Sequence, residues 1–287
     1  MIELATKPGD GIALHVPCYP PFLASIQRSG RSVVPIEWRD TGNGWEADTG
    51  DLAGRLERAG VTMLVVVNPH NPTGRVLSRL ELSTLAKVAR ELDLTVLSDE
   101  IHSDLIYDGH QHVPFASLDQ DAADRTVTAT SASKAFNIAS FHCSVAHVGP
   151  ERLWNALTRA PTNLYGSPSG LSIVAHTAAW TESEEWLAEV MAVLSANRDT
   201  IAQWAARLGL THHAPEATYL AWLGFGGTRA ARGEAAEYLE NRAKVMLNPG
   251  SHFSRGTGLD TRSWARINFA TTEGTLLEIL DRIERSL

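Results

Sequence analysis

Three polar side chains with different chemistry each follow an apolar stretch that is typical of a buried strand. They are Asn71, Asp99 and Lys134. In an open parallel sheet, ligands bind in the crevice at the carboxyl ends of the strands, so these side chains are expected to converge there. A lysine amine forms a Schiff base with an aldehyde, a carboxylate keeps a pyridine nitrogen protonated, and an amide hydrogen-bonds a phenolate. The combination indicates chemistry on an aromatic aldehyde cofactor, pyridoxal 5′-phosphate (PLP).

The elements that must position these residues follow a strand, helix, strand order. Residues 61–67 form an apolar, β-branched run that ends in the turn-forming segment 68–74. Ser78 and Glu81 have the spacing of a capping box and open a helix that extends to about residue 92. A second apolar run at 94–97 leads to Asp99. This βαβ unit predicts a parallel sheet covered by helices.

The rest of the chain predicts a third strand before Lys134 and a second, smaller region. Residues 171–208 favour two helices, the later one long. The other predicted elements are strands at 125–130, 218–224, 244–247 and 265–269 and helices at 233–243 and 272–287. The predicted fold class is therefore α/β, a mainly parallel sheet with helices on both faces in a large domain, residues 1–185, plus a smaller α+β C-terminal domain, residues 186–287.

Composition narrows the class of partner. The chain has 287 residues and a formal net charge of -8 without a long basic run, which argues against nucleic acid and anionic membranes as partners. The longest apolar stretches are too short to span a bilayer. Cys18 and Cys143 are its only cysteines, which excludes a disulfide framework and favours a cytoplasmic location. A small-molecule ligand is expected.

Four motifs, in order and spacing, closely resemble the fold-type-I PLP enzymes of the class I and II aminotransferase superfamily. They are segments 68–74, 98–102, 131–137 and 264–269. Within that superfamily, segment 16–22 and the histidine at position 102 look most like the cystathionine β-lyase branch, the carbon-sulfur lyases. The resemblance runs from about Thr6 to the C-terminus. It implies the PLP-transferase fold and a homodimer whose active sites are completed across the subunit interface.

The resemblance also implies roles for the residues that match its motifs. Lys134 would bind the cofactor as a Schiff base, Asp99 would pair with the pyridinium nitrogen, and Asn71 would bond the phenolic oxygen, with His102 near that same oxygen. Tyr19 would stack on the pyridine ring.

The phosphate and the substrate have their own implied contacts. Ser131 and Ser133 would help to hold the phosphate, and Arg266 would bind the α-carboxylate of an amino acid substrate in a bidentate pair. His142 stands where relatives usually place an arginine or lysine close to the phosphate, which predicts a weaker contact.

Each of these residues also has a structural interpretation when taken alone. Asp99 would serve as a helix N-cap, Asn71 as a turn former, and Lys134 as a surface residue. Tyr19 and His102 would pack without a chemical role, and Arg266 would be a surface strand residue. Two histidine pairs have spacings that a metal could use but lack a carboxylate or cysteine partner, so solvated loops are predicted at 110–112 and 212–213.

The N-terminal residues 2–10 resemble the end of a helix that, in the family, begins with a loop cradling the phosphate. The chain is therefore expected to lack about the first quarter of a family member, and with it backbone donors for a doubly charged anion. This predicts weaker cofactor binding and exposed apolar surface.

Three functions follow as alternatives. The first is a PLP-dependent carbon-sulfur β-lyase that cleaves cystathionine or cysteine conjugates to a thiol, pyruvate and ammonia. The second is a PLP-dependent amino acid aminotransferase. The third is a truncated, non-catalytic relative.

Overall fold

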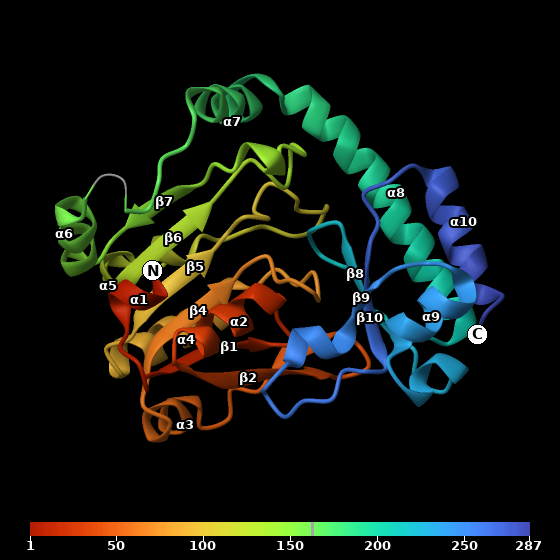
Figure 1. Cartoon of the computed structure of the whole chain (residues 1–287), viewed down its shortest axis with the longest axis horizontal. Helices are drawn as coiled ribbons and strands as arrows, with labels where there is room; N and C mark the ends of the chain where they lie inside the picture. Colours follow the sequence, from red (N-terminus) through yellow and green to blue (C-terminus); the bar gives the residue numbers. More distant parts are fainter. Residues whose placement is uncertain (162–163) are drawn as a thin grey trace.

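The computed structural model describes residues 1–161 and 164–287 and contains a large and a small sheet (Figure 1). The large sheet has the strand order β3-β2-β1-β4-β5-β6-β7. Strands β1, β2, β4, β5 and β6 are parallel, and β3 and β7 run antiparallel at the two edges. Its strands are β1 (Gly11–Val16), β2 (Ser32–Asp40), β3 (Trp45–Ala47), β4 (Val61–Val67), β5 (Thr95–Asp99), β6 (Thr126–Thr130) and β7 (Val145–Val148).

Helices cover both faces of the large sheet because its strands alternate apolar side chains between two cores. In β4, Leu64 and Val66 face one core, while Met63 and Val65 face the other. The first core is closed by α3 (Leu52–Arg58), α4 (Arg79–Glu91) and α5 (Gln120–Arg125), and the second mainly by α2 (Pro20–Arg28) together with the short α1 (Ile2–Ala5). The predicted α/β class, with its mainly parallel sheet and helices on both faces, is confirmed.

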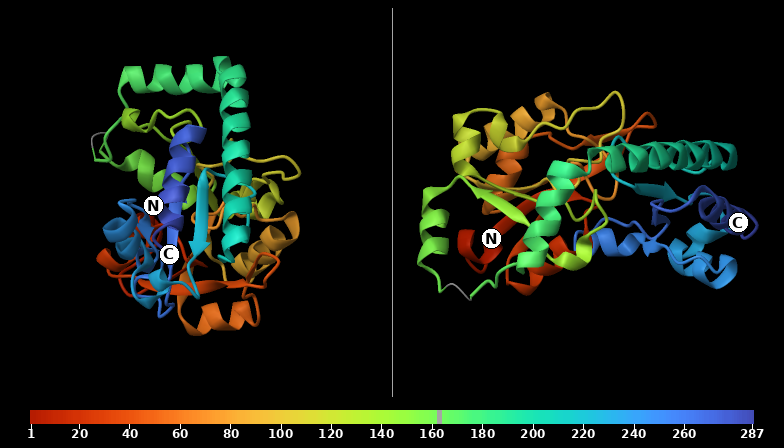
Figure 2. Two further views of the ribbon diagram at one scale, coloured as in Figure 1. Left: turned by 90° about the vertical axis from the view of Figure 1, so that its right-hand side faces the viewer. Right: turned by 90° about the horizontal axis from the view of Figure 1, so that it is seen from above.

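The small sheet lies near the C-terminal part of the chain and has its own core. Strands β8 (Leu220–Gly224), β10 (Trp264–Asn268) and β9 (Asn248–Pro249) are antiparallel. They pack with α8 (Glu184–Leu208), α9 (Ala235–Ala243) and α10 (Glu273–Glu284). The long α8 is the later of the two predicted helices, and it extends from α7 (Gly170–Glu182) along the small sheet (Figure 2). The domain boundary at residue 185 stays a prediction.

One predicted strand is wrong. Residues 244–247 alternate buried and exposed side chains, with Val245 and Leu247 buried and Met246 80% exposed, as a strand would. They pair with no strand among the described residues, because Lys244 takes a left-handed conformation (φ 57°) at the end of α9 and pairing with β10 begins only at Asn248. The alternation of buried and exposed side chains here reflects an extended segment that lies against the core on one side, without hydrogen bonds to a neighbouring strand.

Helix α6 (Glu151–Arg159) contacts the edge strand β7 and the short α1.

Along the described ranges 1–161 and 164–287, no helix is both long enough and apolar enough to cross a membrane.

Candidate active site

The carboxyl ends of three neighbouring strands of the large sheet lie level with one another. The parallel register pairs Val67 of β4 with Asp99 of β5, and Asp99 in turn with Ala129 of β6. Asn68 N donates to Asp99 O (3.0 Å) just beyond the β4 end. The loops that carry Asn71 and Lys134 therefore begin beside Asp99, as the βαβ reading predicts.

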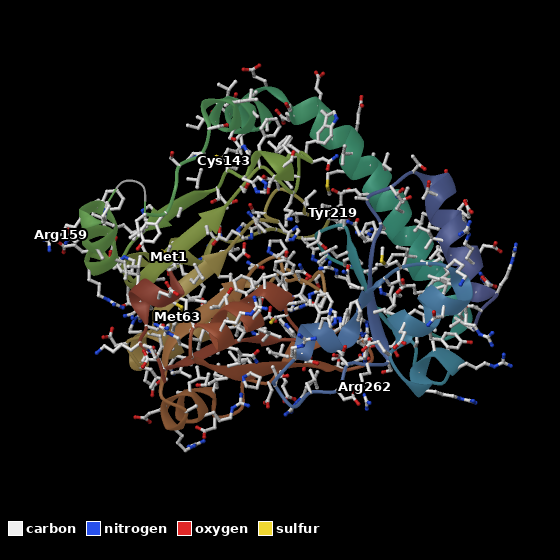
Figure 3. All side chains as sticks on the ribbon, in the orientation of Figure 1. Met1, Met63, Cys143, Arg159, Tyr219 and Arg262 are labelled. Carbon is white, nitrogen blue, oxygen red and sulfur yellow. The ribbon has the colours of Figure 1, made fainter. Side chains whose placement is uncertain are left out.

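A cavity of about 290 Å³ opens at this edge of the sheet. Six of the predicted site residues line it together: Tyr19, Asn71, Asp99, His102, Lys134 and Arg266. Five further residues complete its wall: Val67, Ile101, Tyr219, Leu220 and Asn268. Side chains from both sheets thus meet in one space, and Tyr219 lies near the middle of the molecule (Figure 3).

Asp99 is poised to meet a positive charge. Its Oδ1 accepts a hydrogen bond from Ile101 N (3.1 Å). Burial raises the pKa of the Asp99 carboxyl to about 6, an effect that the Ile101 hydrogen bond and the nearby Lys134 charge only partly offset. A cationic ring nitrogen in the cavity would reverse that shift.

Lys134 follows β6 in the turn that starts at Ser131. It lines the cavity described above and also a second one on its other side. Its charge lowers the pKa of both Asp99 and His102, so the amine lies close enough to each for their charges to interact. The interpretation of Lys134 as an isolated surface residue does not fit this position.

Arg266 lies in β10 and reaches across to the loop after β4. Its Nη1 donates to Asn71 Oδ1 (2.8 Å), and its Nη2 donates to Asn248 Oδ1 (2.8 Å). The guanidinium also lies over the Phe253 ring, 5.0 Å from its centroid. Burial lowers the pKa of Arg266, but the guanidinium stays protonated at neutral pH. The fork is therefore held by two neutral amide oxygens, which a carboxylate would outcompete as acceptor.

His102 is a buried, neutral imidazole. Burial lowers its pKa to about 3, and the Lys134 and Arg266 charges act in the same direction. Its ring meets the edge of the Tyr219 ring at 5.9 Å between centroids. Its Nδ1 is buried and finds no hydrogen-bond partner within the described part of the chain. His102 thus lines the cavity and carries a buried polar atom whose hydrogen bond is unmet among the described residues.

Tyr19 contributes an accessible aromatic ring to the cavity. It is the N-cap residue of α2 and stays 39% exposed, with its edge toward Phe22 (6.4 Å between centroids). Two prolines follow it, which pre-organise the first turn of the helix. The ring is thus free to stack on a planar ligand.

Ser131 and Ser133 lie in the same turn as Lys134 but are engaged locally. The Ser131 hydroxyl donates to Cys143 O (2.6 Å) and accepts from Ser133 N (3.1 Å). It also lies 3.2 Å from Nε2 of the buried His176 on α7. Their role toward a phosphate stays a prediction, and His176 is a neighbour that sequence reasoning did not single out.

Three cavity or contact residues were missed from the sequence, although signals for one of them exist. Asn268 lies two residues after Arg266 in β10 and so points to the same face of the strand. Tyr219 precedes β8, and Asn248 precedes Pro249. Only the tertiary structure brings these last two beside Arg266 and His102.

The two histidine pairs are not simply solvated, which corrects the prediction. His112 Nε2 lies 3.0 Å from Oε2 of the buried Glu100, and His212 Nδ1 lies 3.1 Å from Trp222 O. Burial lowers the pKa of His212. The partners of these rings, Glu100 and the Trp222 carbonyl, lie ten or more residues away along the chain, so the local sequence does not show them. No group of three or more metal-binding side chains occurs among the described residues.

The cavity fits the ring of PLP. It offers an amine for an aldehyde, a carboxyl whose raised pKa awaits a cation, and an amide for a phenolic oxygen. In the described ranges, His102 Nδ1 and Arg266 Nε are buried polar atoms still without a partner. The set of lining residues matches this cofactor and its amino acid substrate.

Comparison with known proteins gives a consistent result. Residues 1–283 match the family model described as aminotransferase class I and II. The chain is 33% identical to cystathionine beta-lyase PatB of Bacillus subtilis (strain 168) over 290 residues, 100% of this chain and 74% of that protein. It is 35% identical to cystathionine beta-lyase of Corynebacterium glutamicum over 288 residues, 98% of this chain and 73% of that protein.

A solved structure shares the same architecture. Cystalysin from Treponema denticola, whose crystal structure contains a pyridoxal 5′-phosphate cofactor, matches with a TM-score of 0.90 and 29% sequence identity. The match covers 99% of this chain and 72% of that one.

Proposed function

The chain belongs to the aminotransferase class I and II family, and from that premise we propose that it is a PLP-dependent carbon-sulfur β-lyase. Its substrate is an S-substituted cysteine such as cystathionine. The observation that carries the proposal is the meeting of Lys134, Asp99, Asn71 and Arg266 in one cavity, with the neutral His102 beside them. The relatives named cystathionine beta-lyase support the same reaction over nearly the whole chain.

The reaction balances as an elimination followed by hydrolysis. An S-substituted cysteine and water give a thiol, pyruvate and ammonium. The Cβ–S bond breaks and the sulfur leaves with the bonding pair, while the α-hydrogen leaves as a proton. PLP, when bound, supplies the electron sink that stabilises negative charge at the α-carbon.

Five residues would hold the ring of the cofactor. Lys134 would bind its aldehyde carbon through Nζ, and Asp99 would keep its ring nitrogen protonated. Asn71 would donate to its phenolic oxygen, with His102 near that same oxygen, and Tyr19 would stack on its ring. Asn71 Oδ1 already accepts from Arg266 Nη1 (2.8 Å), which orients the amide so that its NH₂ group remains free to donate.

Arg266 binds and orients the substrate. The α-carboxylate takes the place of the Asn248 oxygen on Nη2 and accepts the second hydrogen of Nη1, whose other hydrogen keeps its bond to Asn71 Oδ1, because a charged acceptor binds a guanidinium fork more strongly than a neutral one. This fixes the α-carbon between Arg266 and Lys134, both of which line the cavity. When the substrate amine replaces Lys134 at the cofactor's aldehyde carbon, the freed Nζ would take the α-proton. The Tyr219 ring, packed against His102 in the cavity wall, would help to keep water from this proton.

The aminotransferase alternative uses the same cofactor contacts and is less favoured, because relatives named cystathionine beta-lyase match over 98–100% of this chain. A homodimer, a cytoplasmic location and phosphate contacts from Ser131 and Ser133 remain part of the proposal.

Pyruvate release tests the proposal. Purified protein with added PLP is expected to release pyruvate from cystathionine, and Lys134→Ala is expected to release none. Borohydride should fix the absorbance band of bound PLP in the parent protein and leave no fixed label in Lys134→Ala. A new amino acid that forms only with an added keto acid would identify an aminotransferase instead. A bound cofactor with neither product would indicate the non-catalytic relative.

A further inference from the structure

A second cavity of about 550 Å³ adjoins the candidate active site, whose own cavity is about 290 Å³. The two share Lys134, Tyr219 and Asn268 as lining residues, so they meet at the lysine that would take the α-proton. A cavity of this size lies within the range of about 300–1,000 Å³ that small-molecule sites occupy. We call this second cavity the α8 groove.

One wall of the α8 groove is a face of α8. Trp186, Val190 and Val193 lie four and three residues apart on that helix and line the groove together, with Leu194 buried behind them. Trp186 is stacked on Phe136, two residues beyond Lys134, at 5.9 Å between centroids and an interplanar angle of 22°. The aromatic wall is thereby tied to the turn that carries the lysine.

The opposite wall comes from the loops that follow β5 and β6 and from the segment after β10. Leu105 and Ala135 contribute apolar surface, and residues 270–272 close the end. Among the described residues that line the groove, the charged ones are Lys134, at the shared boundary, and Glu189, on α8. The groove therefore offers apolar surface and one carboxylate, and its far part offers no cation.

We infer that the α8 groove binds the S-substituent of the substrate and selects cysteine conjugates with a large apolar group on sulfur. This inference rests on the proposed lyase function. With the α-carboxylate on Arg266 and the α-carbon beside Lys134, the substituent on the β-carbon extends across the boundary that the two cavities share. Burial of an apolar group there is favourable.

Cystathionine fits this groove less well. Its S-substituent ends in an ammonium and a carboxylate. Glu189 can pair with the ammonium, but the carboxylate far along the groove meets no cation among the described lining residues and would be buried against apolar surface. We therefore expect kcat/KM for S-benzylcysteine to exceed that for cystathionine by about tenfold or more.

Kinetics on the PLP-loaded protein test the inference. The ratio of kcat/KM for S-benzylcysteine to that for S-methylcysteine is measured in the parent protein and in Val190→Trp, which fills the groove. The ratio is expected to fall by about tenfold.

Val174→Trp, at an exposed position on α7, is the matched control and should leave the ratio unchanged. A ratio unaltered in Val190→Trp, or a parent preference for cystathionine, would overturn the inference.

Binding separates a failure of this inference from a failure of the proposed function. The carbon analogue 2-amino-5-phenylpentanoate carries the same substituent but has no C–S bond to cleave. Its binding is followed by the fluorescence of Trp186, with Trp186→Phe as the blank. If none of the three cysteine derivatives yields pyruvate, the lyase function fails. In that case weaker analogue binding in Val190→Trp still supports the groove, and equal binding in both proteins refutes it.

Discussion

At the residue scale, Asp99 shows how the surroundings decide a side chain's chemistry. Burial holds its pKa at about 6, above the ordinary value of 3.8, in the absence of a cationic ligand. The folded chain thus binds this proton more tightly than the unfolded chain does. The contribution of Asp99 to stability is therefore complete below a pH of about 4 and is lost as the pH rises through about 6.

Asp99→Asn removes this titration. Without PLP, the free energy of unfolding of the parent protein relative to Asp99→Asn should fall by up to about 3 kcal/mol between a pH of about 4 and about 7. Urea unfolding of both proteins at a series of pH values measures the difference. Parallel pH profiles would contradict the assignment of the raised pKa to Asp99. Added PLP should reduce the difference, because a cationic ring nitrogen favours the carboxylate.

Substrate binding by Arg266 depends on the forked geometry of its guanidinium more than on its charge. Arg266→Lys keeps the charge but loses the fork that now contacts Asn71 and Asn248. We expect kcat/KM to fall about ten- to a hundredfold, mainly through a higher KM, since the bidentate carboxylate contact is lost. Steady-state kinetics with cystathionine measure this.

A matched control for Arg266→Lys is available on the surface. Arg262 forms an exposed pair with Asp260 and lies apart from the labelled Tyr219 (Figure 3). Arg262→Lys should leave KM unchanged. Equal effects of the two substitutions would show that Arg266 does not bind substrate.

At the element scale, α4 depends on its N-terminal capping box. Glu81 N donates to Ser78 Oγ (3.2 Å), and Ser78 N donates to Glu81 Oε2 (2.7 Å). The helix packs Leu82 and Leu85 against the sheet whose strands end at the active site. Cap and core thus act together to position β4 and β5.

Ser78→Ala should lower the free energy of unfolding by about 1 kcal/mol, because one helix N–H loses its acceptor. Urea denaturation measures the change. Thr84→Ala removes a hydroxyl from the exposed middle of the same helix and is the control, with a much smaller expected loss. A larger loss in Thr84→Ala than in Ser78→Ala would disprove the cap's contribution.

At the scale of the whole molecule, Glu216 joins the loop after β4 to the segment that enters the small sheet. Its Oε1 pairs with Arg75 Nη1 (3.1 Å), and its Oε2 accepts from Val76 N (2.7 Å). Glu216 N and Ala217 N both donate to Gly74 O (2.9 and 3.0 Å). This junction holds the loop that carries Asn71, which follows the large sheet, near Arg266 of the small sheet.

Glu216→Gln should destabilise the fold by about 1–3 kcal/mol, because a half-buried charge-assisted contact is lost. The same change should raise KM, since the junction aligns Asn71 with Arg266. Urea unfolding and steady-state kinetics test the two effects. Glu240→Gln, at an exposed position on α9, is the control for the loss of charge. A destabilised variant with unchanged KM would show that the junction supports stability alone.

The sequence by itself determined the elements whose signals are local. The β-branched run of β4, the capping box of α4 and the turn formers after β4 each follow from neighbouring residues, and together they predict the βαβ unit and the convergence of Asn71, Asp99 and Lys134. The PLP family followed from motifs that lie in order along the chain.

Only the tertiary structure decided which distant residues share a space. Tyr219 and Asn248 join the site, His112 and His212 become partly buried, His176 meets Ser131, and residues 244–247 stay outside the small sheet. Each of these outcomes depends on contacts between segments far apart in the chain. Local propensity carries no information about such contacts, because burial and strand pairing are properties of the packed molecule.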